Sequence, residues 1–322
     1  MRKNLPVFLL KLALTVGILA YLFSEQVRVQ ELFPVLERVS LGLLGLALVI
    51  WLSGNLLRTW RWQIMLRLFA LTYRYQRLLP IFFIGTFFSA FTPGTLGADA
   101  ARVFWTRREQ RAPYSLIIGS ILLERGAGLL AVLCLFAVFS LVYSFEIFGV
   151  RITWVAGALL GLFVLAMMVL SAARLAAPLC RLLRWLPGKR LAEELDLLLG
   201  AIRALRFQLA SIVLPLAISF VHQLSLIGIN WVLAQGLRIP VSFGHLCLFV
   251  PAIHLLVALP ATINGIGIRE AGYLALFNLV DISPAASVSL SLVYFLVNMA
   301  ANAVGGLVFL FYRQGQSVAE GG

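Results

Sequence analysis

Long apolar runs separated by short basic loops recur along the whole chain. Several of these runs reach the roughly 20 residues that a helix needs to cross a bilayer. An all-α, polytopic membrane protein is therefore the expected fold class. The pattern predicts about six full transmembrane helices, at residues 5–23, 41–57, 115–143, 153–171, 210–237 and 285–312.

Two further apolar segments, residues 78–101 and 245–281, do not fit a single crossing. The first has arginine clusters on both flanks, and such clusters mark the cytoplasmic side of a membrane. A hairpin that enters the membrane and returns satisfies both flanks. Thr92-Pro93-Gly94 supplies the turn in the first segment, and Pro260 with Asn264-Gly265 does so in the second. The sequence thus predicts two re-entrant helical hairpins.

The same motif lies in both predicted hairpins. P-G-T-L-G-A-D-A-A-R runs from Pro93 to Arg102, and P-A-T-I-N-G-I-G-I-R runs from Pro260 to Arg269, 167 positions later. Interruptions at corresponding positions of two halves are typical of transporters built from internal repeats, with the binding site between the repeats.

The offset of 167 residues also relates the predicted spans to one another. The order span, span, hairpin, span occurs once in residues 5–143 and again in residues 152–312. Counting crossings gives the two repeats opposite orientations and leaves both termini in the cytoplasm. We therefore expect one membrane domain over residues 1–322, an inverted-topology repeat, with residues 172–208 as a cytoplasmic basic connector.

Composition agrees with a membrane protein. Hydrophobic residues make up 61% of the chain and charged residues 12%, against about 25% charged in soluble proteins. In a soluble protein the net charge of +13 would suggest a nucleic-acid partner. Here the basic residues sit in short loops, so membrane topology and anionic lipid headgroups explain them.

Five arginines follow the predicted span at 41–57 and are interleaved with Trp and Tyr. This pattern predicts a separate interfacial helix with its charges at the membrane surface. Arg58 and Arg61 lie three positions apart, and we expect them to contact lipid headgroups or to anchor the interface together with tryptophan. The five arginines are Arg58, Arg61, Arg67, Arg74 and Arg77.

Charged residues inside apolar sequence are the candidate binding residues, because a charge at the bilayer centre costs about 2.5–3.5 kcal/mol on insertion scales. Arg102 and Arg269 each follow a hairpin break by nine residues. Near helix N-termini, two guanidiniums would form a clamp for a phosphate group. The alternatives are that Arg102 belongs to the cytoplasmic basic cluster and that Arg269 forms a structural pair with Glu270 or Asp99.

Glu124 and Arg125 are the most polar positions on a predicted full span. Adjacent residues on a helix point about 100° apart, so we expect each to find its own partner across the bundle. The carboxylates of Asp99, Glu124 and Glu270 are also candidate proton carriers. The predicted binding set is Thr95, Asp99, Arg102, Glu124, Arg125, Thr262, Asn264, Arg269 and Glu270.

Nothing in the sequence favours an enzyme, a cofactor or a metal. His222, His245 and His254 lack ligand spacing, and Cys134, Cys180 and Cys247 are scattered. No Walker loop, nucleophile elbow or His-Glu-x-x-His motif is present. Gly305-Gly306 predicts a close helix contact.

Four motifs together resemble the flippase-like membrane domain of lysylphosphatidylglycerol synthases, in the family of standalone transmembrane-region proteins. They are R-T-W-R-W at 58–62, P-G-T-L-G-A-D-A-A-R at 93–102, E-R-G-A-G at 124–128 and G-I-G-I-R-E-A-G at 265–272. The resemblance implies a bacterial inner-membrane protein that moves lipids or lipid-linked intermediates between leaflets. We do not expect it to extend to lysylation, because the residues after Arg313 are too few to form the aminoacyl-transferase domain of bifunctional relatives.

The leading hypothesis is a flippase or transporter for an anionic, phosphate-bearing lipid. The alternative is a non-transporting membrane partner of a glycosyltransferase or another lipid-modifying enzyme. A membrane-embedded enzyme that uses Glu124 or Asp99 as acid or base, and a small-anion channel, are further possibilities.

Overall fold

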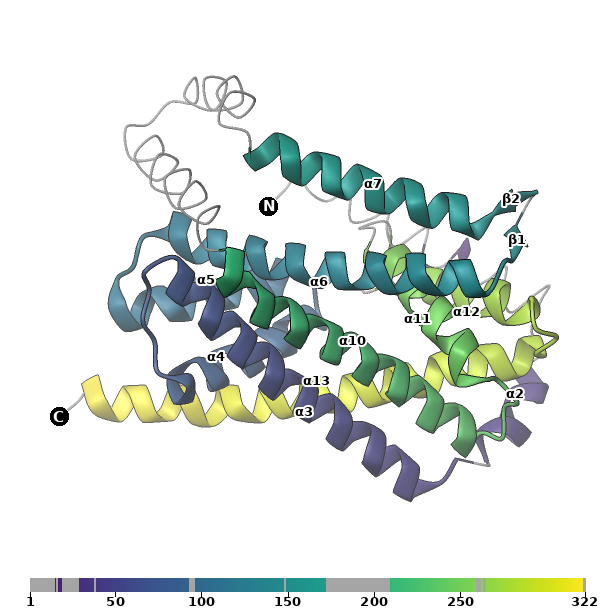
Figure 1. The fold of residues 1–322 in the computed structure, drawn as a ribbon. Helices are drawn as coiled ribbons and strands as arrows, with labels where there is room; N and C mark the ends of the chain where they lie inside the picture. Colours follow the sequence, from purple (N-terminus) through teal and green to yellow (C-terminus); the bar gives the residue numbers. More distant parts are fainter. Residues whose placement is uncertain are drawn as a thin grey trace. The chain divides into compact units, whose positions relative to one another are not determined.

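Helices make up nearly all of the part of the chain that the computed structural model describes, which is residues 15, 17–18, 29–37, 39–92, 96–147, 149–171, 209–258, 262 and 265–320 (Figure 1). The predicted first helix at 5–23 lies almost wholly outside these residues, and the basic connector at 172–208 does so completely. The helices are α2 (Val29–Leu36), α3 (Leu41–Leu68), α4 (Tyr75–Ser89), α5 (Leu96–Gln110), α6 (Tyr114–Val142), α7 (Ile152–Ser171), α10 (Leu209–Gly236), α11 (Phe243–Ala258), α12 (Ile268–Asn278) and α13 (Pro284–Glu320).

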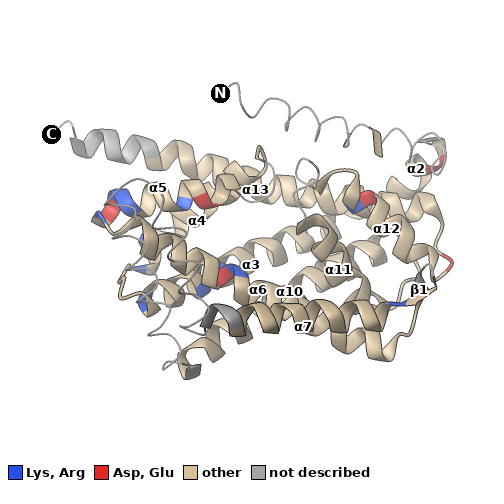
Figure 2. Cartoon of the chain, turned by 90° about the horizontal axis from the view of Figure 1, so that it is seen from above, with Lys and Arg blue, Asp and Glu red and all other residues tan. Residues whose placement is uncertain are grey.

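Four helices are long and apolar enough to cross a membrane. They cover Leu41–Leu68, Tyr114–Val142, Ala210–Gly236 and Pro284–Tyr312, which correspond to four of the six predicted spans. A shorter apolar helix covers Ile152–Met168, which overlaps the predicted span at 153–171. Figure 2 shows long stretches of these helices without charge and the charged residues gathered in a few places.

The predicted interfacial helix is wrong. α3 continues without a break from Leu41 to Leu68, so Arg58, Arg61 and Arg67 belong to the same helix as the apolar run before them. This stretch contains no proline, and its last turn precedes Ala70, which has a left-handed φ of 58°. The change from apolar to basic sequence near residue 57 suggests a new helix. A helix ends at a breaker or a cap, however, and none ends α3 before its last turn.

α4 and α5 form an antiparallel helix pair. At the turn, the Gly97 amide donates to the Thr92 hydroxyl (3.0 Å), and a Cβ on Gly97 would lie 2.7 Å from the Phe88 carbonyl oxygen. At the other end, the Tyr73 hydroxyl donates to the Thr106 carbonyl oxygen (3.1 Å). The chain therefore reverses direction between Thr92 and Leu96, whereas Pro93 and Gly94 of the predicted turn lie outside the described residues. Only glycine fits at position 97, because the two backbones approach so closely.

α11 and α12 form a second antiparallel pair. The rings of Phe249 and Phe277 lie 5.5 Å apart, and a Cβ on Gly272 would touch Ile253. At the turn, Gly265 has a φ of 71°, and a Cβ there would lie 2.6 Å from Val257. Glycine is thus required for both its conformation and its small size.

Both pairs are short for a membrane crossing. α4 and α5 have 15 residues each, α11 has 16 and α12 has 11. At 1.5 Å per residue these helices are about 16–24 Å long, less than the hydrocarbon thickness of about 30 Å.

The element order repeats with the offset seen in the motifs. Shifting the starts of α3 and α4 by 167 residues brings them to within one residue of the starts of α10 and α11. The starts of α5 and α6, shifted by the same number of residues, likewise fall close to the starts of α12 and α13. The opposite orientation of the two sets in a membrane stays a prediction.

The predicted close contact at Gly305-Gly306 is confirmed. A Cβ on Gly305 would lie 2.0 Å from the Phe83 carbonyl oxygen, and one on Gly306 would lie 2.8 Å from the Phe87 ring. α13 therefore packs directly on the backbone of α4.

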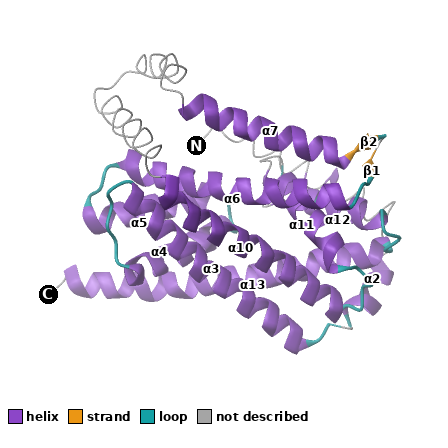
Figure 3. Ribbon diagram, in the orientation of Figure 1, coloured by secondary structure: helices purple, strands orange, loops and turns teal. Residues whose placement is uncertain are grey.

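Two short strands interrupt the helical fold between α6 and α7 (Figure 3). β1 (Glu146–Ile147) pairs antiparallel with β2 (Val150–Arg151), and α6 and α7 pack against each other on either side of this hairpin. Arg151 donates to Glu146 across the strands at 3.2 Å, with both side chains more than half exposed. The hairpin reverses the chain between two apolar helices.

The chain divides into two compact units that do not follow the repeat boundary. Unit 1 comprises residues 1–55, 83–98 and 223–322, and unit 2 comprises residues 56–82 and 99–222. Each unit takes segments from both predicted repeats.

Candidate functional site

A line of alternating charges lies in unit 2. Glu124 on α6 accepts from Arg61 on α3 at 2.8 Å and, through its other oxygen, from Arg102 on α5. A guanidinium nitrogen of Arg102 is 3.9 Å from Asp99, and Asp99 also pairs with Arg125. We call these five residues the alternating cluster. Three guanidiniums face two carboxylates, so the cluster carries one net positive charge.

The cluster extends from the interior toward the surface of unit 2. The side chains of Arg61, Arg102 and Glu124 are at most 6% exposed, whereas that of Asp99 is 24% exposed and that of Arg125 is 43% exposed. A ligand that reaches Arg125 would therefore meet a graded series of charges rather than a sealed core.

Aromatic and hydroxyl groups hold the buried arginines in place. The Arg102 guanidinium lies 4.0 Å from the centre of the Trp62 ring, and the Trp62 indole donates to the Ser120 hydroxyl at 3.2 Å. Arg61 donates to the Ser219 hydroxyl on α10 at 2.8 Å. Arg58, one turn before Arg61, lies over the Phe82 ring at 5.0 Å. Stacking on an aromatic face and pairing with a carboxylate offset part of the desolvation cost of a buried guanidinium.

The expectation that Glu124 and Arg125 have separate partners is confirmed. Glu124 pairs with Arg61 and Arg102, and Arg125 pairs with Asp99. Arg61 itself is placed in the interior, not at a lipid-facing surface, because Glu124 binds it there. Sequence reasoning missed this role of Arg61, and also Trp62 and Ser219 as supports.

Arg269 lies in a different environment, in unit 1. On the first turn of α12 it donates to the adjacent Glu270 at 2.9 and 3.1 Å, and its Nε lies 3.2 Å from the Ser291 hydroxyl on α13. Its guanidinium is 4.5 Å from the Phe295 ring. The structural pair with Glu270, one of the alternatives for this arginine, is therefore formed. We call Arg269 and Glu270 the Arg269 pair, and Ser291 supplies the hydroxyl beside it.

Glu270 has two functions in this arrangement. One oxygen accepts from Arg269 and from Ser291 (2.9 Å), and the other accepts from the Gly267 amide (2.6 Å), which caps the start of α12. The pair is electrically neutral and 2–5% exposed. A cavity of about 110 Å³ beside it is lined by Arg269, His254, Tyr273 and Asn298, among others.

The remaining predicted residues are only partly described. Thr262 is 2% exposed, and its hydroxyl has no hydrogen-bond partner among the described residues. Thr95 and Asn264 lie outside the described residues. Arg102 and Arg269 belong to different units, so the two-arginine phosphate clamp stays a prediction. Within the described part of the chain, no group of three His, Cys, Asp or Glu side chains could hold a metal ion.

The family model described as the lysylphosphatidylglycerol synthase TM region matches residues 8–306. A search of curated proteins finds no match.

Proposed function

Because the chain belongs to the lysylphosphatidylglycerol synthase TM region family, a family of multi-pass membrane domains, we propose that it transports an anionic, phosphate-bearing lipid between the leaflets of a membrane. The family relates the chain to membrane lipids; movement of a lipid is our inference. The proposed activity is transport and not catalysis.

The observation that carries this proposal is the positive excess of the alternating cluster. Two buried guanidiniums share the single carboxylate of Glu124. In a low-dielectric interior an uncompensated positive charge is costly, and an anionic ligand would neutralise it. Arginine also presents a planar fork that fits a phosphate with two hydrogen bonds. A phosphate headgroup that enters past the half-exposed Arg125 would therefore be stabilised at Arg61 and Arg102.

The two short helix pairs support a route through the membrane. We propose that α4–α5 and α11–α12 are re-entrant, since each helix is shorter than the hydrocarbon thickness and each pair reverses at a glycine-dependent turn. In this proposal the pairs enter from opposite sides, as an inverted repeat requires, and both termini are cytoplasmic. The acyl chains stay in the bilayer while the headgroup passes along the polar residues.

Reconstitution into liposomes tests the proposal. Fluorescent phosphatidylglycerol and fluorescent phosphatidylcholine are compared by the rate at which an impermeant quencher reaches the probe. Wild type should move phosphatidylglycerol faster than phosphatidylcholine. Arg61→Met removes the excess charge but leaves the Arg102–Glu124 pair, so it should slow phosphatidylglycerol transport by at least about tenfold, the effect of one charge-assisted contact.

Arg151→Met is the matched control, since Arg151 is exposed and lies in the β-hairpin. It should leave the rate unchanged. The proposal fails if wild type moves phosphatidylglycerol no faster than protein-free liposomes do, or if Arg61→Met transports it at the wild-type rate.

A further inference from the structure

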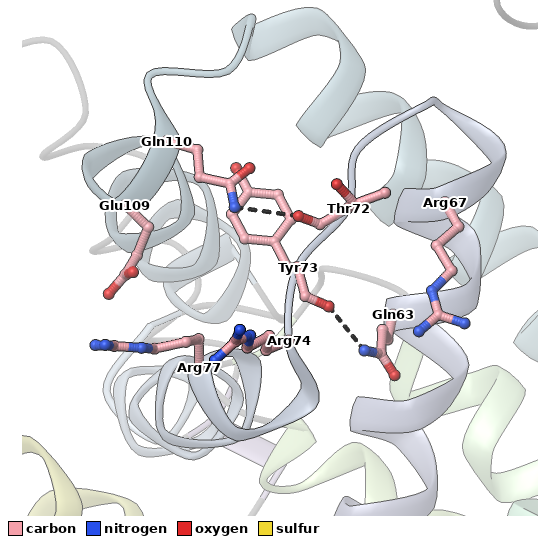
Figure 4. A pocket seen from close by; sticks show the side chains of 8 residues that line it. All are labelled: Gln63, Arg67, Thr72, Tyr73, Arg74, Arg77, Glu109 and Gln110. Carbon is pink, nitrogen blue, oxygen red and sulfur yellow. Dashed lines mark hydrogen bonds between the residues drawn. The ribbon is translucent and has the colours of Figure 1, made fainter.

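A second basic feature of unit 2 is a cavity of about 690 Å³ where α3 ends, α4 begins and α5 ends (Figure 4). Arg67 comes from α3, Arg74 from the loop before α4 and Arg77 from the first turn of α4, and the one carboxylate comes from the last turn of α5. The volume is large enough for a phosphate group with an attached glycerol or sugar. The lining residues are Gln63, Arg67, Thr72, Tyr73, Arg74, Arg77, Glu109 and Gln110.

Hydrogen bonds fix the wall of this cavity. The Gln63 amide donates to the Tyr73 carbonyl oxygen (2.7 Å), and the Gln110 amide donates to the Thr72 carbonyl oxygen (3.1 Å), as the dashed lines in Figure 4 show. The Tyr73 hydroxyl donates to Thr106 on α5. Hydrogen bonds thus hold the loop between α3 and α4 against both α3 and α5. A wall that is fixed in advance lowers the cost of ordering it around a ligand.

The charge of the cavity is strongly positive. Arg67, Arg74 and Arg77 are exposed, and within the described residues no carboxylate lies within 4.0 Å of their guanidiniums. Glu109 is the single acidic residue in the lining. Burial, and secondarily the Glu109 carboxylate, raise the pKa of Tyr73 to about 12, so its phenol adds no negative charge at neutral pH. The lining therefore carries a formal excess of two positive charges.

This cavity is distinct from the alternating cluster. Arg102, Thr106 and Gln110 follow each other at intervals of four residues on one face of α5, with Arg102 in the cluster and Gln110 in the cavity. Eight residues of helix correspond to about 12 Å. Thr106 is fully buried between the two places, and its carbonyl oxygen accepts from the hydroxyl of Tyr73 in the cavity wall.

We propose that this cavity binds the phosphate group of an anionic ligand. The guanidiniums and the two amide side chains of the lining are donors that match the acceptor oxygens of a phosphate mono- or diester. They come from α3, the loop before α4, α4 and α5, so they would surround the phosphate. The same chemistry is offered by the headgroup of an anionic phospholipid and by a free phosphate compound. The proposal does not depend on transport, because it concerns binding at equilibrium.

Calorimetric titration of the purified full-length protein in a neutral detergent is the first test, with inorganic phosphate as the probe. Native mass spectrometry of the same preparation, with phosphatidylglycerol added, is the second. The double variant Arg74→Ala/Arg77→Ala should weaken binding of the probe by at least about tenfold. Arg108→Ala/Arg151→Ala removes the same two charges from exposed positions outside the lining, and it should change binding by less than about twofold.

The two sources are distinguished by competition. If phosphatidylglycerol prevents phosphate binding, or is retained by wild type and lost by the double variant, the ligand is a lipid headgroup. If phosphate binds and phosphatidylglycerol has no effect, the ligand is a soluble phosphate compound. The proposal is overturned if neither probe binds, or if the double variant binds as wild type does. Arg74→Gln/Arg77→Gln, with a size-exclusion profile and a melting curve, provides a second variant of the same charge.

Discussion

The alternating cluster and the Arg269 pair occupy corresponding places in the sequence but differ in charge. At the offset of 167 residues, Arg102 corresponds to Arg269 and Glu124 to Ser291. Arg102 on α5 donates to Glu124 on α6, and Arg269 on α12 donates to Ser291 on α13. In both cases the arginine lies on the second helix of a short pair, and its partner lies on the long helix that follows. The position of the contact is thus the same in both units, while a carboxylate receives the arginine in one and a hydroxyl in the other.

The surroundings explain the difference in net charge. The positions that correspond to Arg61, Asp99 and Arg125 are Gly228, Ile266 and Leu292. With no other charge available there, Arg269 is neutralised by its own neighbour Glu270, and the result is a closed, neutral pair. Arg102 instead shares Glu124 with Arg61. Corresponding contacts therefore do not imply two equal ligand sites, and the positive excess is the reason why we propose the alternating cluster, and not the Arg269 pair, as the anion site.

Glu124→Gln should have the largest effect on stability. The substitution leaves Arg61 and Arg102 buried without their carboxylate, and breaking a buried pair in this way costs about 3–5 kcal/mol. Thermal unfolding of the purified protein in detergent measures it. Glu146→Gln, at an exposed pair, is the control. Equal losses from the two substitutions would contradict the central place of Glu124.

Glu270→Gln should cost less, about 2–3 kcal/mol, because one arginine loses its charge partner and the new amide still offers an acceptor oxygen. The cap at Gly267 weakens as well, since the acceptor is no longer charged. The same melting experiment ranks the two carboxylates. A loss greater than that of Glu124→Gln would reverse the comparison.

Ser291→Glu makes the second unit resemble the first. Alone it should destabilise by about 1–3 kcal/mol, because a second carboxylate comes close to Glu270 beside a single arginine. Combined with Glu270→Gln it should recover at least about 1 kcal/mol, since Arg269 again has one carboxylate to pair with. A double-mutant cycle of unfolding free energies measures the coupling. Additive losses would mean that positions 124 and 291 are not structurally equivalent.

Asp99→Asn should have the smallest effect on stability, below about 1 kcal/mol, since its pair with Arg125 is partly exposed. It raises the positive excess of the cluster, however, so retention of phosphatidylglycerol in native mass spectrometry should increase. An unfolding loss as large as that of Glu124→Gln would place Asp99 in the closed interior and not at an accessible end.

Much of the fold could be predicted because it depends on local chemistry. Apolar runs of about 20 residues specify helices, and the breaks near Thr92 and Gly265 follow from residues that end helices. The sequence also indicated the corresponding positions Arg102 and Arg269, the separate partners of Glu124 and Arg125, and the contact at Gly305-Gly306. Each of these inferences needs only the periodicity of one helix or the matching of two segments.

Only the tertiary structure decided how the charges are shared. The sequence shows that Arg61, Arg102 and Glu124 exist, but 63 positions separate Arg61 from Glu124, and a basic loop between them made Arg61 look like a surface residue. The packing of α3, α5 and α6 brings two guanidiniums to one carboxylate. Helix periodicity determines which face a side chain occupies. Which other helix that face meets depends on packing over the whole chain, and so the net charge of a buried site is a property of the fold.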